Sequence, residues 1–336
     1  MTACTSSDLV AFLAACGEPD VSLAPLPGDA SARRYYRLEG RGKMLMEDRV
    51  DPDGFAGFIR IARHLAALGL SAPQVHCADA ESGLALIEDF GTRTYSVQLA
   101  AGRDEAELYA LAVDALLHLH HHPQAGAVDV PDYDLATLLD ELSIFTQWFA
   151  PALRPDVDVA AFDAAFRALW QAPLAGLNKG PSTLVLRDFH VDNLMELEGR
   201  EGVRRCGLLD FQDGVIGLPE YDLVSLLQDA RRDLEPGLEK TMLQRYIASA
   251  PKGAGGETEI LHRYHLLGAQ RHTRIAGVFL RLNLRDDKPG YLRFLPRVLR
   301  QMEEALQAAG LTEITEFLDR ELPEWRQAGP TLIGTA

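Results

Sequence analysis

Two acidic side chains and one amide stand at a spacing that suits phosphate chemistry. Asp188 and Asn193 are five positions apart and follow the apolar run 184–186; Asp210 lies seventeen positions further on, at the end of a second apolar run. Because Asp188 and Asn193 follow one predicted strand and Asp210 ends another, we expect the three side chains to meet around one point. Phosphoryl transfer needs such a set. One carboxylate takes the proton of the accepting hydroxyl, while an amide oxygen and a second carboxylate hold Mg²⁺ on the phosphates.

The same segment allows plainer interpretations. Asp188 or Asp192 could satisfy backbone N–H groups in a tight turn. His190 could be a structural hydrogen bonder or lie near a substrate, and Asp213 could join Asp210 at the metal or shape the next turn. Alone, the order D-x4-N is a weak pattern, but a second Asp-Phe after another apolar strand repeats the order of the protein kinase catalytic and metal loops. The leading hypothesis is therefore a phosphotransferase that uses ATP and Mg²⁺.

Composition limits the alternatives. The chain has 336 residues, of which 47% are hydrophobic and 24% charged, as in globular proteins. A formal net charge of −16 argues against broad binding to nucleic acid or to an anionic membrane. Four dispersed cysteines without a CxxC pair predict reduced thiols and no zinc site. No apolar run reaches the roughly 20 residues that span a bilayer, and the N-terminus predicts an amphipathic helix, so we expect a cytoplasmic protein.

The pattern of apolar residues changes along the chain. Up to residue 88 it predicts two strands joined by a turn at 39–42, a helix over 55–69, and two strands at 75–78 and 84–87. After residue 103 it predicts mostly helix, except for the strand-rich stretch 183–213; the predicted helices are 104–121, 134–149, 159–171, 221–231, 236–248, 257–283 and 291–309. We therefore predict an α+β fold with a small β-rich lobe, 1–90, and a larger, mainly helical lobe, 91–336.

Several segments together resemble a known family. They are GDASARRYYRL (28–38), LIEDFGTRTY (86–95), LRDFHVDNLM (186–195), LLDFQDGVIGLPEYDLVSLLQDARRD (208–233) and QRHTRIAGVFLRLNLRDDKPGYL (270–292). The chain resembles the kinase-like aminoglycoside phosphotransferase superfamily, and within it the cytosolic anomeric kinases of N-acetylmuramate and N-acetylglucosamine that feed peptidoglycan recycling. The third segment is shared by the whole superfamily, whereas the first and the last two are narrower signals.

The resemblance implies a bilobal protein-kinase-like fold and a role for each motif. It makes Asp188 the catalytic base, and Asn193 and Asp210 the Mg²⁺ ligands. It places the hinge that would meet adenine at Glu88, Asp89 and Phe90, and the loop 28–34, with Ser31, over the ATP phosphates. The partners it implies are ATP and a small sugar. An aminoglycoside kinase, a kinase of another small metabolite, and a non-catalytic nucleotide-binding scaffold remain alternatives, and the oligomeric state is open.

The sequence departs from the family pattern in the phosphate clamp. Leu186 stands where many relatives have a histidine before Arg-Asp. The position expected for the ATP lysine falls near Met46 or Glu47, and the helix 55–69 offers no glutamate to pair with it. Since both members of the usual ion pair are missing, we expect a different clamp, for which Arg33, Arg34 and Lys43 are the candidate cations.

The sequence says least about the residues that would bind the sugar, which accepts the phosphate. Glu141 could hydrogen-bond a sugar or face solvent. Arg271 or Arg274 could meet an anionic group such as the lactyl carboxylate of N-acetylmuramate, or form a salt bridge within the helical lobe. The histidine run 118–122 lacks the acidic partner of a zinc motif, and we interpret it as cations at a helix C-terminus.

Overall fold

The computed structural model describes residues 6–27 and 33–329. The chain divides into two compact units, residues 1–130 with 186–215, and residues 131–185 with 216–336. The division into lobes at residue 90 stays a prediction. Across the described ranges, none of the helices combines the length and the apolar character needed to cross a bilayer.

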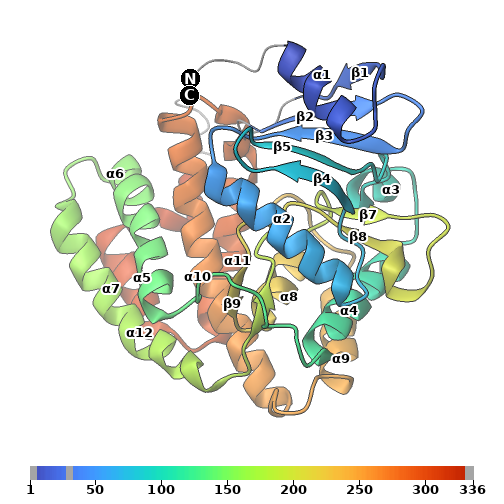
Figure 1. Cartoon of the computed structure of the whole chain (residues 1–336). Coiled ribbons are helices and arrows are strands. Elements are labelled where there is room, and N and C mark those ends of the chain that lie inside the picture. Colours follow the sequence, from blue (N-terminus) through green and yellow to red (C-terminus); the bar gives the residue numbers. More distant parts are fainter. Residues whose placement is uncertain (1–5, 28–32, 330–336) are drawn as a thin grey trace. The chain divides into compact units, whose positions relative to one another are not determined.

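The first unit contains a five-stranded antiparallel sheet in the order β1-β2-β3-β5-β4 (Figure 1). Its strands are β1 (Leu23–Pro25), β2 (Arg34–Leu38), β3 (Lys43–Glu47), β4 (Val75–Asp79) and β5 (Leu84–Glu88). The two predicted strand pairs and their turns are confirmed. β1, a short edge strand beside β2, is an addition to the predicted set.

The two faces of this sheet have different partners. Helix α1 (Ser6–Ala15) packs its leucines on one face, in an apolar cluster formed by Leu9, Leu13, Leu38, Leu45, Leu84 and Leu86. Successive side chains of a strand point to opposite faces, so Tyr35, Met46 and Ile87 belong to the other face. That second face is the one that carries the polar chemistry described below.

Helix α2 (Pro52–Ala67) follows β3 and begins three residues before the predicted start at residue 55. Asp51 is its N-cap and accepts a hydrogen bond from the Gly54 amide at 2.9 Å, and Pro52 occupies the first turn, where its missing N–H costs nothing. Phe55, Phe58 and Leu65 are buried along one side of the helix. The predicted helix 55–69 is therefore confirmed, with a capped start that the apolar periodicity did not reveal.

Helices α3 (Tyr95–Ala100) and α4 (Glu105–His121) complete the helical part of the first unit. The histidine run at the end of α4 is only partly as predicted. His118 contacts the Leu68 carbonyl through Nε2 at 2.8 Å. Burial lowers the pKa of His120 to about 3, so its imidazole is neutral and the predicted cationic role is wrong for that residue.

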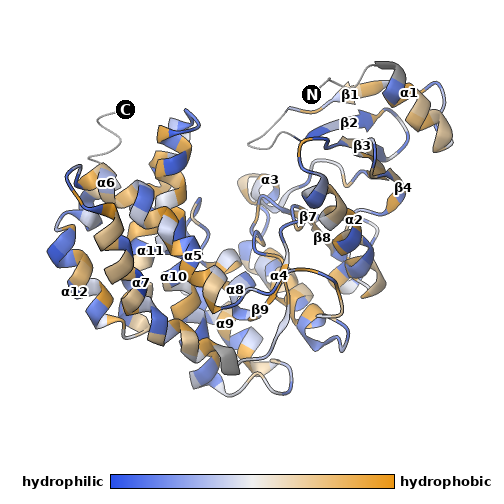
Figure 2. Cartoon of the chain, turned by 60° about the vertical axis from the view of Figure 1, so that its left-hand side comes forward, coloured by the Kyte–Doolittle hydropathy of each residue, from blue (hydrophilic) through white to orange (hydrophobic). Residues whose placement is uncertain are grey.

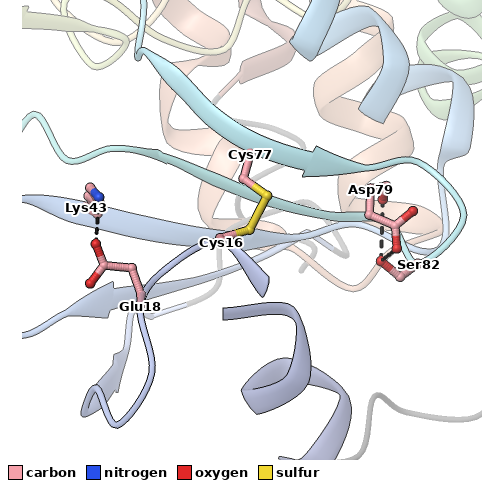
Figure 3. The surroundings of a disulfide bond; sticks show 6 residues. All are labelled: Cys16, Glu18, Lys43, Cys77, Asp79 and Ser82. Carbon is pink, nitrogen blue, oxygen red and sulfur yellow. Dashed lines mark hydrogen bonds and ion pairs between the residues drawn. A yellow bond between two sulfur atoms is a disulfide. The ribbon is translucent and has the colours of Figure 1, made fainter. Parts of the chain in front are cut away.

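A disulfide bond joins Cys16 to Cys77, so the prediction of four reduced thiols is wrong (Figure 3). The two cysteines are 61 positions apart in the sequence, and their Cα atoms lie 6.0 Å apart. They meet because α1 packs on the sheet that contains β4, and beside them Glu18 pairs with Lys43 at 2.6 Å. Cys206 is a buried free thiol.

Short strands frame the polar loop predicted to carry the chemistry. β7 (Leu194–Glu196) pairs antiparallel with β8 (Cys206–Leu208) in the first unit, with the 3₁₀ turn Gly202–Arg205 between them. β6 (Thr183–Val185) pairs with β9 (Val215–Gly217). The predicted strand, loop, strand, turn and strand over 183–213 is confirmed, and β9 continues it.

The second unit is mainly helical. Its helices are α5 (Leu135–Ile144), α6 (Ala150–Leu153), α7 (Val159–Ala175), α8 (Glu220–Leu227), α9 (Leu238–Ala248), α10 (Glu257–Leu284), α11 (Leu295–Ala308) and α12 (Thr312–Glu321). Hydrophobic and hydrophilic residues alternate along α7, α10 and α12 in Figure 2, as in helices that bury one side. Three further short 3₁₀ elements are Gly176–Lys179, Pro289–Phe294 and Trp325–Gln327.

Two of the predicted helices differ in detail. The predicted helix 134–149 changes to a π-helical turn at Phe145–Phe149, where Gly277 of α10 comes close to the backbone. A Cβ atom at Gly277 would lie 2.5 Å from the Phe145 amide nitrogen. The predicted helix 291–309 begins as a 3₁₀ segment, and α12 lies beyond the predicted set.

Candidate active site

The loop between β6 and β7 is a series of tight backbone turns. The Asp188 amide donates to the Leu186 carbonyl at 2.8 Å, and the Asn193 amide donates to the His190 carbonyl at 2.8 Å. Arg187 has a φ of 69°, a left-handed conformation that is costly for a residue with a side chain. Such strain persists where the surroundings hold it, and functional loops are common places for it.

Asn193 joins the predicted catalytic residues. Its Nδ2 donates to the Asp188 carbonyl at 3.0 Å and to Asp210 Oδ2 at 3.3 Å, and it lies 3.4 Å from His190 Nε2. These bonds fix the orientation of the amide, with its nitrogen toward the Asp188 carbonyl and the Asp210 carboxylate. The structure therefore brings Asp188, His190, Asn193 and Asp210 together in the first unit.

The pairing of β7 with β8 explains this meeting. Leu194 lies opposite Leu208, and the Leu209 amide donates to the Asn193 carbonyl at 2.9 Å. The residue after Leu209 is Asp210, which adopts a left-handed φ of 56° and carries an exposed carboxylate. Strand register thus converts a separation of seventeen positions into a direct contact.

The donor chemistry of this set fits a magnesium ion. Asn193 offers an amide oxygen and Asp210 a carboxylate, and Mg²⁺ prefers hard oxygen ligands. Within the described residues, no group of three or more histidine, cysteine, aspartate or glutamate side chains could hold a metal ion by itself. Mg²⁺ in phosphotransferases usually takes one or two protein ligands and completes its shell with phosphates and water. The two protein oxygens fit that arrangement.

Arg33 is the candidate clamp cation that lies at the active-site loops. The β2–β3 hairpin pairs Arg34 with Glu47, which places the preceding Arg33 opposite Asp48; Arg33 Nε donates to Asp48 Oδ2 at 2.9 Å. Both side chains are buried. Burial alone would lower the pKa of Arg33, but Tyr35 and Asp48 outweigh it and raise that pKa, so the guanidinium stays charged.

The other proposed clamp residues have different environments. Arg34 is exposed on β2, on the face opposite Tyr35. Lys43 is paired with Glu18 near the disulfide. Ser31 lies outside the described residues. A phosphate contact of Arg33, Arg34 or Ser31 stays a prediction, and the geometry favours Arg33.

The predicted hinge residues lie at the end of β5: Glu88 is its last residue, and Asp89 and Phe90 follow it. The Glu88 and Asp89 amides donate to carbonyl groups of adjacent loop residues at 2.9 and 3.0 Å. Their carboxylates pair with Arg200 and Arg37, and the Arg200 guanidinium lies 5.1 Å from the centre of the Phe90 ring. The backbone amides of Glu88 and Asp89 therefore already donate hydrogen bonds within the protein. Of the three predicted hinge residues, Phe90 is the better candidate for a contact with adenine.

The predicted acceptor residues lie in the second unit. Arg274 Nε is 3.3 Å from Glu141 Oε1, and Tyr133 donates to the other oxygen of Glu141. Arg271 is buried and donates to Ser225 Oγ at 3.0 Å. The structure thus brings Glu141 and Arg274 together in an ion pair, as in the salt-bridge alternative, and their binding to a sugar stays a prediction.

Two site residues escaped the sequence reasoning. Asp48 lies outside the helix 55–69, where the family pattern places the partner of the clamp cation. The hairpin register could have found it, since a turn at 39–42 places residue 48 opposite residue 33. Gln212 stands where protein kinases have a glycine, and its Nε2 donates to Asp210 Oδ1 at 2.9 Å. Its amide type, next to the predicted metal ligand Asp210, was the available signal.

Comparison with known proteins agrees with this geometry. Residues 22–260 match the model of the phosphotransferase enzyme family. The N-acetylmuramate/N-acetylglucosamine kinase of Caulobacter vibrioides is 36% identical, over 93% of this chain and 95% of its own. The enzyme of the same name from Pseudomonas aeruginosa is 32% identical, over 92% and 91%.

A solved structure is similar as well. The ADP-bound aminoglycoside phosphotransferase APH(2'')-Ib matches with a TM-score of 0.59 over 91% of this chain and 99% of its own. At 17% sequence identity this likeness concerns the fold alone. Together these similarities confirm the predicted kinase-like α+β fold and the predicted family resemblance.

Proposed function

Because the chain belongs to the phosphotransferase enzyme family, we propose that it is an ATP-dependent kinase that phosphorylates the anomeric hydroxyl of N-acetylmuramate or N-acetylglucosamine. The observation that carries the proposal is the position of Asn193, whose amide contacts both the Asp188 backbone and the Asp210 carboxylate. The names of the relatives supply the sugar.

Each residue of the site has a part in the proposed reaction. The Asp188 carboxylate accepts the proton of the anomeric hydroxyl as the sugar oxygen forms its bond to the γ-phosphorus of ATP, and the bond to the bridging oxygen breaks to release ADP. Asn193 and Asp210 would hold Mg²⁺, which neutralises charge on the phosphates when bound. Arg33 would contact phosphate oxygens, and Asp48 holds its guanidinium in place.

Positioning supplies most of the rate in such a reaction. The strained turn at Arg187 and the hydrogen bonds of Asn193 fix the Asp188 loop before a substrate arrives. The hinge would hold adenine near Phe90. Arg271 or Arg274 would meet the lactyl carboxylate of N-acetylmuramate, and Glu141 the sugar hydroxyls. A cytoplasmic location, where ATP is available, belongs to the same proposal.

A substrate panel tests the function. The purified chain is incubated with ATP, Mg²⁺ and N-acetylmuramate, N-acetylglucosamine, other sugars, choline or aminoglycosides, and the position of the phosphate in each product is determined. We expect an acid-labile sugar 1-phosphate. Phosphorylation of other alcohols alone would assign a different acceptor.

A matched pair of variants tests the role of Asp188. We expect Asp188→Asn to lower kcat by about a thousandfold, within the usual range for loss of a general base, and to leave nucleotide affinity unchanged. Asp192→Asn, the same change at an exposed position of the same loop, serves as the control and should remain active. Equal ATP consumption by the wild type and Asp188→Asn, with every acceptor, would instead support a non-catalytic scaffold.

A further inference from the structure

The side chain of Gln212 lies between a cation and a predicted metal ligand. Its Oε1 accepts a hydrogen bond from Arg33 Nη1 at 3.0 Å, and its Nε2 donates to Asp210 Oδ1 at 2.9 Å. An amide can accept from a guanidinium and donate to a carboxylate at the same time, which neither a carboxylate nor an amine side chain can do. Nε2 also lies 3.4 Å from Asp213 Oδ2, so a cation on the oxygen and two carboxylates on the nitrogen define the orientation of the amide.

The surroundings hold Gln212 in this place. Phe211, the residue before it, stacks on Phe58 of α2 with ring centres 5.2 Å apart. Gly57 of α2 lies so close that a Cβ atom there would be 2.8 Å from the Gln212 carbonyl oxygen. The Arg33 guanidinium also lies over the Phe58 ring, at 5.7 Å from its centre. Helix α2 thus supports the Gln212 backbone and the cation together.

The neutral amide also separates the two charges. A direct ion pair between Arg33 and Asp210 would compete with a metal ion for the carboxylate. With Gln212 between them, Asp210 Oδ1 is anchored by a neutral donor and Oδ2 faces Asn193. The guanidinium of Arg33 bonds to Asp48 through Nε and to Gln212 through Nη1, and it also interacts with Tyr35.

We propose that Gln212 is a positioning residue that couples the phosphate clamp to the metal site, because it connects Arg33 to Asp210 through one amide. This inference rests on the proposed function, in which Arg33 meets phosphate and Asp210 meets the metal. Its consequence is cooperativity. A nucleotide that orders Arg33 also orders Asp210, so metal and nucleotide bind more tightly together than apart.

A double-mutant cycle on metal affinity tests the coupling. The variants are Arg33→Lys, which keeps the charge but loses the planar fork, Gln212→Met, which keeps the unbranched shape but loses both polar atoms, and the double variant. Mn²⁺ serves as the probe, and free Mn²⁺ is measured by electron paramagnetic resonance with and without ADP. Gln124→Met, at an exposed glutamine of the first unit, is the control and should leave Mn²⁺ affinity unchanged.

The expected pattern is specific. In the presence of ADP each single variant should weaken Mn²⁺ binding by about tenfold, the loss typical of a partner that orients a metal ligand. The double variant should bind Mn²⁺ as tightly as the single variant with the lower affinity, because either change alone already breaks the connection. Without ADP, Arg33→Lys should have little effect.

Contrary outcomes separate the inference from the function. Losses that multiply in the double variant, or unchanged Mn²⁺ affinity in Gln212→Met, overturn the coupling while the wild type still binds metal and nucleotide. A wild-type chain that binds no Mn²⁺ with ADP refutes both the coupling and the proposed function. Retained ADP binding without metal shows that each variant is folded, so a weakened Mn²⁺ affinity is a local effect.

Discussion

Replacing Gly57 with alanine measures the contact between α2 and Gln212. Gly57 is buried in the interior of α2, and an added Cβ would stand 2.8 Å from the Gln212 carbonyl oxygen. On helix propensity alone this substitution should stabilise the protein by about 1 kcal/mol. The structure predicts the opposite sign, because the group in the way is backbone and cannot rotate aside.

The size of the effect follows from the distance. An ordinary contact needs about 3.4 Å, so the helix and the Gln212 carbonyl must separate by about 0.6 Å. Crowding of this kind costs roughly 1–3 kcal/mol, which outweighs the propensity gain and leaves a net loss of about 1 kcal/mol. Since the displaced residue also contacts Arg33 and Asp210, we expect kcat/KM to fall by about tenfold.

The assay must report on the first unit. Trp148, Trp170 and Trp325 all belong to the second unit, so tryptophan fluorescence would follow the wrong part of the chain. Hydrogen exchange of peptides from α2 and β3, together with urea unfolding followed by circular dichroism, measures the loss of stability. Gly176→Ala is the control: that glycine has a right-handed helical φ of −64°, and an added Cβ would meet nothing within 4 Å.

We expect Gly176→Ala to leave activity unchanged and to leave stability equal or slightly raised. If Gly57→Ala also stabilised the protein by about 1 kcal/mol and kept its full activity, α2 would not contact Gln212 as described. Loss of stability without any loss of kcat/KM would show that the contact is structural and has no connection with the metal ligands.

Three further predictions concern buried charge, acid and the disulfide. Asp48→Asn leaves the buried guanidinium of Arg33 without its carboxylate and should destabilise the first unit by about 3 kcal/mol in urea unfolding; a loss below about 0.5 kcal/mol would show that the pair is not needed. Burial lowers the pKa of His120 to about 3, so between pH 6.5 and 3 the unfolded chain binds a proton that the folded chain refuses, and stability is lost as the pH falls through this window. At pH 5.5 the loss should be about 1.4 kcal/mol, and His120→Leu should remove that part of the pH dependence; parallel curves for the two proteins would contradict it. Reduction of the bond between Cys16 and Cys77, which are 61 positions apart, should cost the first unit about 4 kcal/mol on the chain-entropy estimate, with kcat/KM little changed because the α1 leucines still pack on the sheet; equal unfolding curves with and without a reductant would argue against the bond.

The loop that contains Asp188 and Asn193, and the strands on either side of it, could be predicted from sequence because the information is local. Asp188 and Asn193 share one loop, and the apolar runs on either side reveal the strands that hold it. Asp210 needed one further step, the assumption that β7 and β8 pair. The acceptor residues had no comparable support, since the contacts of Glu141 and Arg274 depend on how α5 and α10 pack, which periodicity does not determine.

The candidate phosphate clamp, Arg33 with Asp48, shows a different limit of prediction from sequence. Hairpin register pairs Arg33 with Asp48, but neither residue stands at the position where the family pattern has its lysine or its glutamate, so that pattern does not reveal the pair. The disulfide was beyond reach, because thiols 61 positions apart meet only through the packing of α1 on the sheet. The π-helical turn at Phe145–Phe149 likewise arises where α10 approaches at Gly277, and nothing in the local sequence marks it.

A disulfide and a buried free thiol in the same unit set conditions for refolding. Thiol–disulfide exchange proceeds through the thiolate, and burial raises the pKa of Cys206 to about 12. At neutral pH only about one folded molecule in 10⁵ carries that thiolate, so the Cys16–Cys77 pairing is kinetically protected while the fold persists. Unfolding exposes Cys206 and returns its pKa to the ordinary range, where it can attack the bond and produce mispaired chains. Heating at alkaline pH should therefore be far less reversible than heating at mildly acidic pH, and a chain that lacks both other thiols, Cys4→Ala with Cys206→Ala, should recover its native pairing in both.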